Sequence, residues 1–145
     1  MTALQAAILI AQLERLDSDI GLRQRNEETI RRELNGIPGL IWQQVPTTVN
    51  RRSHYLLLGR IERAAFGASR DEFHRKLTGR GIPCTPFYPH PLYGNPMYAG
   101  GGCRVEPCPV AEACIQDAFW FPHRVLMSGD EVIEALVLTI KHMAG

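Results

Sequence analysis

Apolar residues recur with a helical period near both ends of the chain and form short continuous runs between them. Thr2 and Gln5 match a capping box, in which two side chains satisfy free backbone N–H groups at a helix start. The periodicity predicts one long helix from there to about Leu34, with a kink at Gly21, because glycine is unfavourable inside a helix. We therefore expect residues 1–35 to form a long connecting helix.

The two halves of this predicted helix differ in polarity. The segment from Arg23 to Glu33 is charged and is predicted to face solvent. The first half is apolar almost all round, through Leu4, Ala7, Ile8, Leu9, Ala11 and Leu13. Such a helix belongs in a deep core or an interface, and its partner could be this domain's own core, a larger N-terminal domain or a second subunit. We expect a second subunit, and hence a homodimer.

Four short apolar runs after residue 36 predict strands. They are residues 39–42, 54–60, 82–85 and 117–121, and Pro83 places the third at a sheet edge. Helices are predicted from the Ser69 capping box to about Arg80, over residues 109–116, and from a Ser128–Glu131 capping box to about Met143. Residues 36–145 thus predict an α+β domain, with three or four mostly antiparallel strands and helices on one face.

Residues 86–106 form a long predicted loop that begins rich in proline, tyrosine and histidine. Loops of this length in compact domains are usually functional or disordered. Its glycine cluster, Gly100–Gly102, lacks the strand–turn–helix context of a phosphate-binding loop and predicts a flexible loop tip.

Composition excludes several classes of function. The chain has 145 residues, of which 45% are hydrophobic and 21% charged, and its formal net charge is +1, so no basic surface for nucleic acid is indicated. No segment approaches the roughly 20 apolar residues that a membrane span needs, and we expect a cytoplasmic protein. The spacing of the cysteines does not match a typical zinc site, and reduced thiols are expected at Cys84, Cys103, Cys108 and Cys114.

Three segments carry a resemblance to a known family. Residues 81–98 read GIPCTPFYPHPLYGNPMY, residues 108–127 run from Cys108-Pro through Trp120-Phe-Pro-His-Arg124 to Met127, and residues 1–16 read MTALQAAILIAQLERL. Together they resemble the C-terminal part of the DegT/DnrJ/EryC1/StrS aminotransferases, which are fold-type-I, PLP-dependent enzymes that aminate keto-sugars and cyclitols. The end of the second segment resembles the subgroup of aminocyclitol aminotransferases and 3-amino-5-hydroxybenzoate synthases.

The resemblance implies that this chain is the small C-terminal domain of such an enzyme. It covers essentially the whole chain but only the last part of the family, so the Schiff-base lysine and phosphate-binding loops would precede Met1. The two lysines present, Lys76 and Lys141, have polar neighbours on predicted amphipathic helices and are expected at the surface. We therefore expect PLP in the full-length family, no cofactor bound by this chain alone, and no catalytic residue or metal ligand within it.

The resemblance also implies a role in recognising a sugar or cyclitol. Tyr88 and Tyr93 lie in the segment that would border the active-site mouth, where they could contact substrate or simply hold the loop against the sheet. Family members often carry histidine in place of Tyr93. His123 could act as an acid or base or as a structural hydrogen-bonding group, and Arg124 could bind a carboxylate.

Two functions remain open on the sequence. The first is a substrate-shaping, dimer-supporting part of a PLP-dependent aminotransferase that uses an amino-acid donor and is catalytically incomplete as this chain. The second is a cofactor-free binding or interaction module left after loss of the catalytic half.

Overall fold

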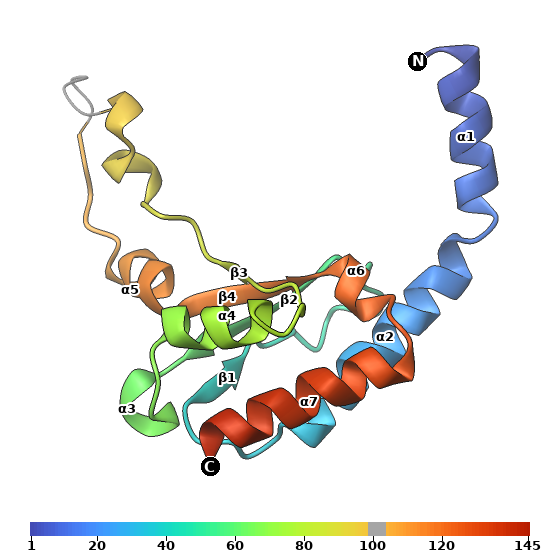
Figure 1. Cartoon of the computed structure of the whole chain (residues 1–145). Coiled ribbons are helices and arrows are strands. Elements are labelled where there is room, and N and C mark those ends of the chain that lie inside the picture. The colour runs from blue at the N-terminus through green and yellow to red at the C-terminus, as the bar shows by residue number, and fades with distance from the viewer. Residues whose placement is uncertain (99–103) are drawn as a thin grey trace.

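A four-stranded antiparallel sheet lies at the centre of the computed structural model, which describes residues 1–98 and 104–145 (Figure 1). Its strands run in the order β1-β2-β4-β3, so the short β3 lies at an edge, as Pro83 predicted. The strands are β1 Leu40–Trp42, β2 Leu56–Ile61, β3 Thr85–Pro86 and β4 Ala118–Pro122. The predicted α+β class and antiparallel sheet are confirmed.

Three of the helices cover one face of the sheet. The three are α2 Leu16–Glu33, α4 Arg70–Thr78 and α7 Asp130–Ala144. The others are α1 Ala3–Leu13, α3 Arg63–Phe66, α5 Pro109–Asp117, α6 His123–Leu126 and the 3-10 turns η1 Leu92–Gly94 and η2 Pro96–Tyr98. The predicted glycine loop tip, Gly100–Gly102, and Cys103 lie outside the described residues.

The core forms where alternate strand residues meet the helices. Leu57 pairs with Phe121 and Gly59 with Phe119, so these four share the helix-covered face. The helices contribute Ile30, Leu34, Phe73, Leu77, Leu136 and Ile140, each at most 1% exposed. Burying each such side chain stabilises the fold by about 1.5–3 kcal/mol. A Cβ on Gly59 would lie 2.7 Å from Cζ of Phe119, so the packed ring leaves space for glycine alone.

The opposite face of the sheet is only partly covered. Leu56, Leu58, Trp120 and Pro122 point to it and remain half-buried. Figure 1 shows α1 and the segment between β3 and β4 rising from this side, away from α7. The open face therefore lies between two projecting parts of the same chain.

The predicted long helix is divided, and its break was predicted at the wrong residue. The interruption falls at Glu14 and Arg15, where the N–H of Arg15 bonds to the carbonyl of Gln12 at 3.2 Å in a tighter turn. Gly21 lies inside α2, in open space where a Cβ would meet only Arg25 at 3.9 Å. The division into a connecting helix over 1–35 and a domain over 36–145 stays a prediction, although α2 contributes Ile30 and Leu34 to the core.

The sequence predicted that the segment from Arg23 to Glu33, which lies in α2, faces solvent, and this prediction was wrong. Arg23, Asn26, Glu27 and Ile30 are buried there, because α2 packs against α6 and α7. Within the described structure no residue of α1 is buried, so α1 is not the central helix of this domain. The described part of this chain therefore leaves the apolar surface of α1 largely uncovered.

Two local predictions at helix ends gave opposite outcomes. The capping boxes at Thr2 and Ser69 are confirmed, and the hydrogen bonds from Ser69 lower the pKa of Glu72. The box predicted at Ser128 is absent, since Gly129 is the N-cap and the Ser128 hydroxyl donates to the carbonyl of Arg124 at 3.2 Å. Competition from a nearby carbonyl thus overrode the sequence pattern.

Candidate functional site

An aromatic cluster on the open face holds the first of the predicted site residues. Trp120 of β4 contacts Phe87 and Tyr88, with ring centroids 5.8 Å apart in both cases. The N–H of Phe87 donates to the carbonyl of Ala118 at 2.9 Å, which extends the edge pairing of β3 by one residue. Tyr88 is thereby held against the sheet while 64% of it stays exposed. Both roles considered for Tyr88, loop anchoring and ligand contact, fit this geometry.

Tyr93 contacts helix α5 and not the aromatic cluster around Trp120. It lies in η1, and its hydroxyl donates to the carboxylate of Glu112 in α5. This hydrogen bond, together with the charge of Glu112, raises the pKa of the Tyr93 phenol above its ordinary value of 10.0. Tyr93 therefore ties the loop after β3 to the helix before β4.

His123 and Arg124 begin α6, directly after β4. The imidazole of His123 stacks on the ring of Tyr55, with centroids 5.2 Å apart and planes 16° from parallel. Among the described residues, the side chain of Arg124 takes part in no hydrogen bond or ion pair, and it is exposed. Tyr55 was not predicted as a site residue, because only the β2–β4 register brings it beside His123.

Neither lysine is placed for covalent cofactor chemistry. Lys76 is exposed on α4, and Nζ of Lys141 lies 3.2 Å from a carboxylate oxygen of Glu33 at the surface. A Schiff-base lysine has to face a pocket that holds the cofactor. The described residues therefore do not fit PLP attachment by themselves.

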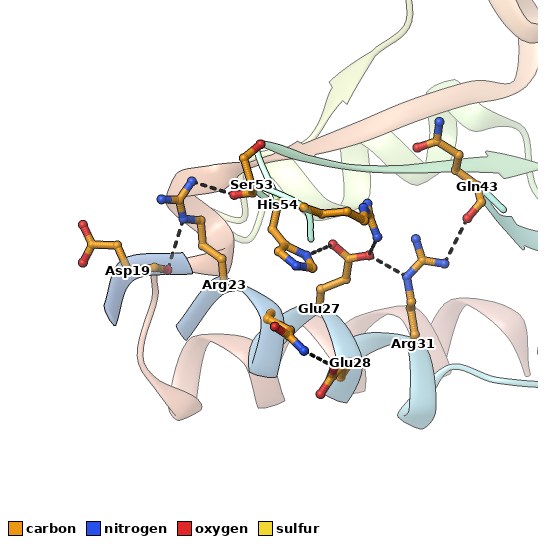
Figure 2. Close-up of polar contacts among 10 residues, drawn as sticks. Asp19, Arg23, Glu27, Glu28, Arg31, Gln43, Ser53 and His54 are labelled. Atoms are coloured by element: carbon orange, nitrogen blue, oxygen red, sulfur yellow. Dashed lines mark hydrogen bonds and ion pairs between the residues drawn. The ribbon is translucent and has the colours of Figure 1, made fainter. Parts of the chain in front are cut away.

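A buried polar cluster was missed entirely by the sequence analysis. Glu27 of α2 is 2% exposed and accepts a hydrogen bond from Arg31 at 2.9 Å (Figure 2). It accepts a second one from Arg52 at 2.8 Å. Nδ1 of His54 lies 2.9 Å from its other carboxylate oxygen. We name these four residues, Glu27, Arg31, Arg52 and His54, the Glu27 cluster.

The Glu27 cluster keeps its carboxylate ionised despite burial. Burial alone would raise the pKa of Glu27, but the hydrogen bonds from His54 and Arg52 and the charges of Arg31 and Arg52 outweigh it. The pKa of Glu27 consequently lies below its ordinary value of 4.5. At neutral pH Glu27 is therefore the ionised partner of both arginines.

The same contacts fasten the segment between β1 and β2 onto α2. Arg23 donates to the carbonyl of Ser53 at 2.9 Å, and Arg31 to that of Gln43 at 3.2 Å (Figure 2). Among the described residues, His54 alone of the non-glycine residues has a positive φ, 49°. Its contact with Glu27 holds it in this uncommon conformation, so β2 begins at Leu56 and not at His54 as predicted.

Two negative observations bound the chemistry of the described part of the chain. No three histidine, cysteine, aspartate or glutamate side chains gather there as metal ligands do. None of the helices described combines the length and apolar character that crossing a bilayer requires.

Burial raises the pKa of the Cys84 thiol to about 12, so this cysteine is a core residue and not a nucleophile.

Comparison with known proteins identifies relatives along nearly the whole chain. Residues 1–137 match the DegT/DnrJ/EryC1/StrS aminotransferase family. The chain is 28% identical over 137 residues to 3-amino-5-hydroxybenzoate synthase of Amycolatopsis mediterranei, covering 90% of this chain and 35% of that protein. It is 30% identical over 139 residues to GDP-perosamine synthase of Caulobacter vibrioides, covering 94% of this chain and 36% of the relative.

The fold agrees with these relatives. A crystal structure of 3-amino-5-hydroxybenzoic acid synthase superposes with a TM-score of 0.79 and 28% identity, covering 95% of this chain and 37% of the other. The chain therefore spans about a third of the length of the proteins it matches.

Proposed function

This chain belongs to the DegT/DnrJ/EryC1/StrS aminotransferase family, and from that premise we propose that it is the C-terminal, substrate-shaping part of a PLP-dependent sugar or cyclitol aminotransferase. The observation that carries the proposal is the match over residues 1–137 to enzymes about three times as long. The whole enzyme would transfer an amino group from an amino-acid donor to a keto-sugar or cyclitol acceptor.

Substrate shaping is assigned to the open face of the sheet and its ends. Tyr88 is held by Trp120 yet 64% exposed, which suits an aromatic ring that packs on one side and meets a ligand on the other. His123 stands at the end of the same strand, with Arg124 exposed beside it. Tyr93 would act indirectly, because its hydroxyl is engaged with Glu112.

The proposal assigns covalent cofactor chemistry to residues outside this chain. When bound, PLP supplies an electron sink for amino transfer and is held by a lysine. Lys76 is exposed and Lys141 is paired with Glu33, so we assign neither amine to the cofactor. The chain would thus be catalytically incomplete alone.

Dimer support is assigned to α1. Leu4, Ile8, Ile10 and Leu13 are all more than half exposed, although each would lose free energy by contact with water. An apolar helix that projects from its domain requires a covering surface, and we propose a second subunit for it (Figure 1).

A chimaera tests the substrate-shaping assignment. Residues 1–145 would replace the matching third of 3-amino-5-hydroxybenzoate synthase, and amino transfer would be measured. We expect an active chimaera in which Tyr88→Ala raises KM for the acceptor more than it lowers kcat, because Tyr88 binds without reacting. Tyr98→Ala, another exposed loop tyrosine, serves as control. A folded chimaera with no activity would contradict the proposed function.

Borohydride reduction tests catalytic incompleteness. The chain would be incubated with PLP, reduced and weighed intact beside a Lys76→Ala, Lys141→Ala double variant. We expect only slow surface labelling. A stoichiometric adduct formed at low PLP on the parent chain alone would show that one of these lysines is functional.

Light scattering tests the role of α1. At micromolar concentration we expect a dimer or larger species that Ile8→Glu converts to a monomer without changing the thermal midpoint of the sheet domain, since no described contact of α1 is buried. A clean monomer of the parent chain would refute dimerisation.

A further inference from the structure

A shallow groove beside β2 joins a cation, an aromatic ring and an apolar floor. Its volume is about 410 Å³, within the range of roughly 300–1,000 Å³ that small-molecule sites occupy. The residues around it are Arg52, Ser53, His54, Tyr55, Leu56 and Leu58. We propose that this groove, here called the β2 groove, binds a small ring-shaped carboxylate, with Arg52 holding the carboxylate and Tyr55 the ring.

Positive charge is in excess around Glu27, and two members of the Glu27 cluster, Arg52 and His54, line the β2 groove. Among the described residues, the guanidinium groups of Arg31 and Arg52 share the single carboxylate of Glu27, and Arg23 bonds only to backbone carbonyls. Arg52 uses Nη1 for Glu27, and its side chain is 24% exposed. Its planar fork presents further N–H groups that match a carboxylate. An anionic ligand would balance this surplus charge.

Tyr55 supplies a ring that is already in place. It is 62% exposed, and its ring stacks on that of His123 with centroids 5.2 Å apart. A supported aromatic side chain loses little conformational entropy when a ligand ring packs on it. The stacking partner thus fixes Tyr55 at the edge of the groove.

The two leucines that line the groove favour a ring over a bare ion. Leu56 and Leu58 lie on the open face of the sheet and are half-buried. Their apolar surface favours a ligand with an apolar body. The Glu27 cluster holds the backbone at His54, which lies between Arg52 and Tyr55 in the chain, with φ at 49°.

This inference goes beyond the proposed function and stands without it, because every residue of the β2 groove lies within this chain. It is tested by NMR titration of the chain at low ionic strength with 3-hydroxybenzoate, uncharged 3-hydroxybenzamide and inorganic phosphate. We expect 3-hydroxybenzoate to bind with Kd on the order of 1 mM, shifting signals of Tyr55 and Leu58. The amide and phosphate should each bind at least about ten-fold more weakly.

Matched variants locate the site. Arg52→Gln should weaken binding about ten-fold, whereas Arg51→Gln, the same change at the exposed neighbour that pairs with Asp17, should leave it unchanged. Tyr55→Ala should weaken binding about five-fold. If Arg52→Gln fails to fold, Arg52→Lys keeps the charge, removes the fork and should give an intermediate loss.

Three results would overturn the proposal. Equal losses in the Arg51 and Arg52 variants would show long-range charge attraction without a site. Phosphate binding as tight as that of 3-hydroxybenzoate would remove the role of the ring. No shift at Tyr55 or Leu58 at saturating probe would show that the groove is not a binding site.

Discussion

Replacing Glu27 by glutamine tests whether the buried Glu27 cluster contributes more to the stability of the fold than an exposed ion pair does. The substitution keeps shape but removes the charge that Arg31, Arg52 and His54 share. Breaking one partner of a buried ion pair costs about 3–5 kcal/mol. The two arginine side chains are 25% and 24% exposed and would regain some hydration, so we expect a loss near the lower end, about 3 kcal/mol. That is a large part of the roughly 5–15 kcal/mol by which domains are stable.

Urea unfolding followed by circular dichroism at neutral pH measures this loss. The matched control is Glu33→Gln, the same change on the same helix, where the partner Lys141 and Glu33 itself are both exposed. We expect a much smaller change there, because exposed ion pairs contribute little. If the two variants unfold at the same urea concentration with equal slopes, the Glu27 cluster does not stabilise the fold in the way argued.

The pH dependence provides a second check on the same residue. The pKa of Glu27 is lowered in the folded chain, so its contribution to stability is present above the ordinary value of 4.5 and is lost as pH falls through the folded-state pKa. The difference between the parent chain and Glu27→Gln should therefore shrink as the solution is acidified below that value. A difference that stays constant into acid would show that Glu27 is not an ionised partner.

Three further predictions concern packing and titration. Gly59→Ala should cost about 1–3 kcal/mol in urea unfolding, because its Cβ would lie 2.7 Å from a buried aromatic ring, whereas Gly129→Ala, with nothing within 4 Å, should be nearly neutral; equal effects would contradict the packing argument. In ultraviolet titration Glu112→Gln should lower the pKa of Tyr93 toward 10.0, and an unchanged phenol would show that their hydrogen bond is not formed in solution. The Cys84 thiol, with a pKa of about 12, should react with iodoacetamide only after unfolding, and rapid labelling of the native chain would refute its burial.

The elements that sequence predicted correctly depend on local rules. The capping boxes at Thr2 and Ser69 join residues three positions apart, and Pro83 excludes a central strand whatever surrounds it. The aromatic run that became β4 is apolar on both faces, which local sequence shows directly. Short α3 and α6 were not predicted, since four residues carry no periodicity.

The candidate site was predicted in part. Tyr88 lies on the open face and His123 follows β4 directly, and the roles of both stay predictions. Tyr93 is engaged with Glu112, nineteen residues away, which no local pattern indicates. Only one feature of the sequence pointed to the Glu27 cluster, the spacing of four residues between Glu27 and Arg31. The same spacing is typical of ion pairs on exposed helices, so it did not indicate burial.

The sequence by itself determined the family, the α+β class and most helix and strand positions, because these depend on periodicity, caps and proline, which act over a few residues. Only the tertiary structure decided which charged residues are buried. Arg52 and His54 reach Glu27 across 25 and 27 residues, and Tyr55 reaches His123 through strand pairing. The physical reason is that the desolvation and pairing of charges depend on which segments meet in space, whereas local conformational preferences depend only on chain neighbours.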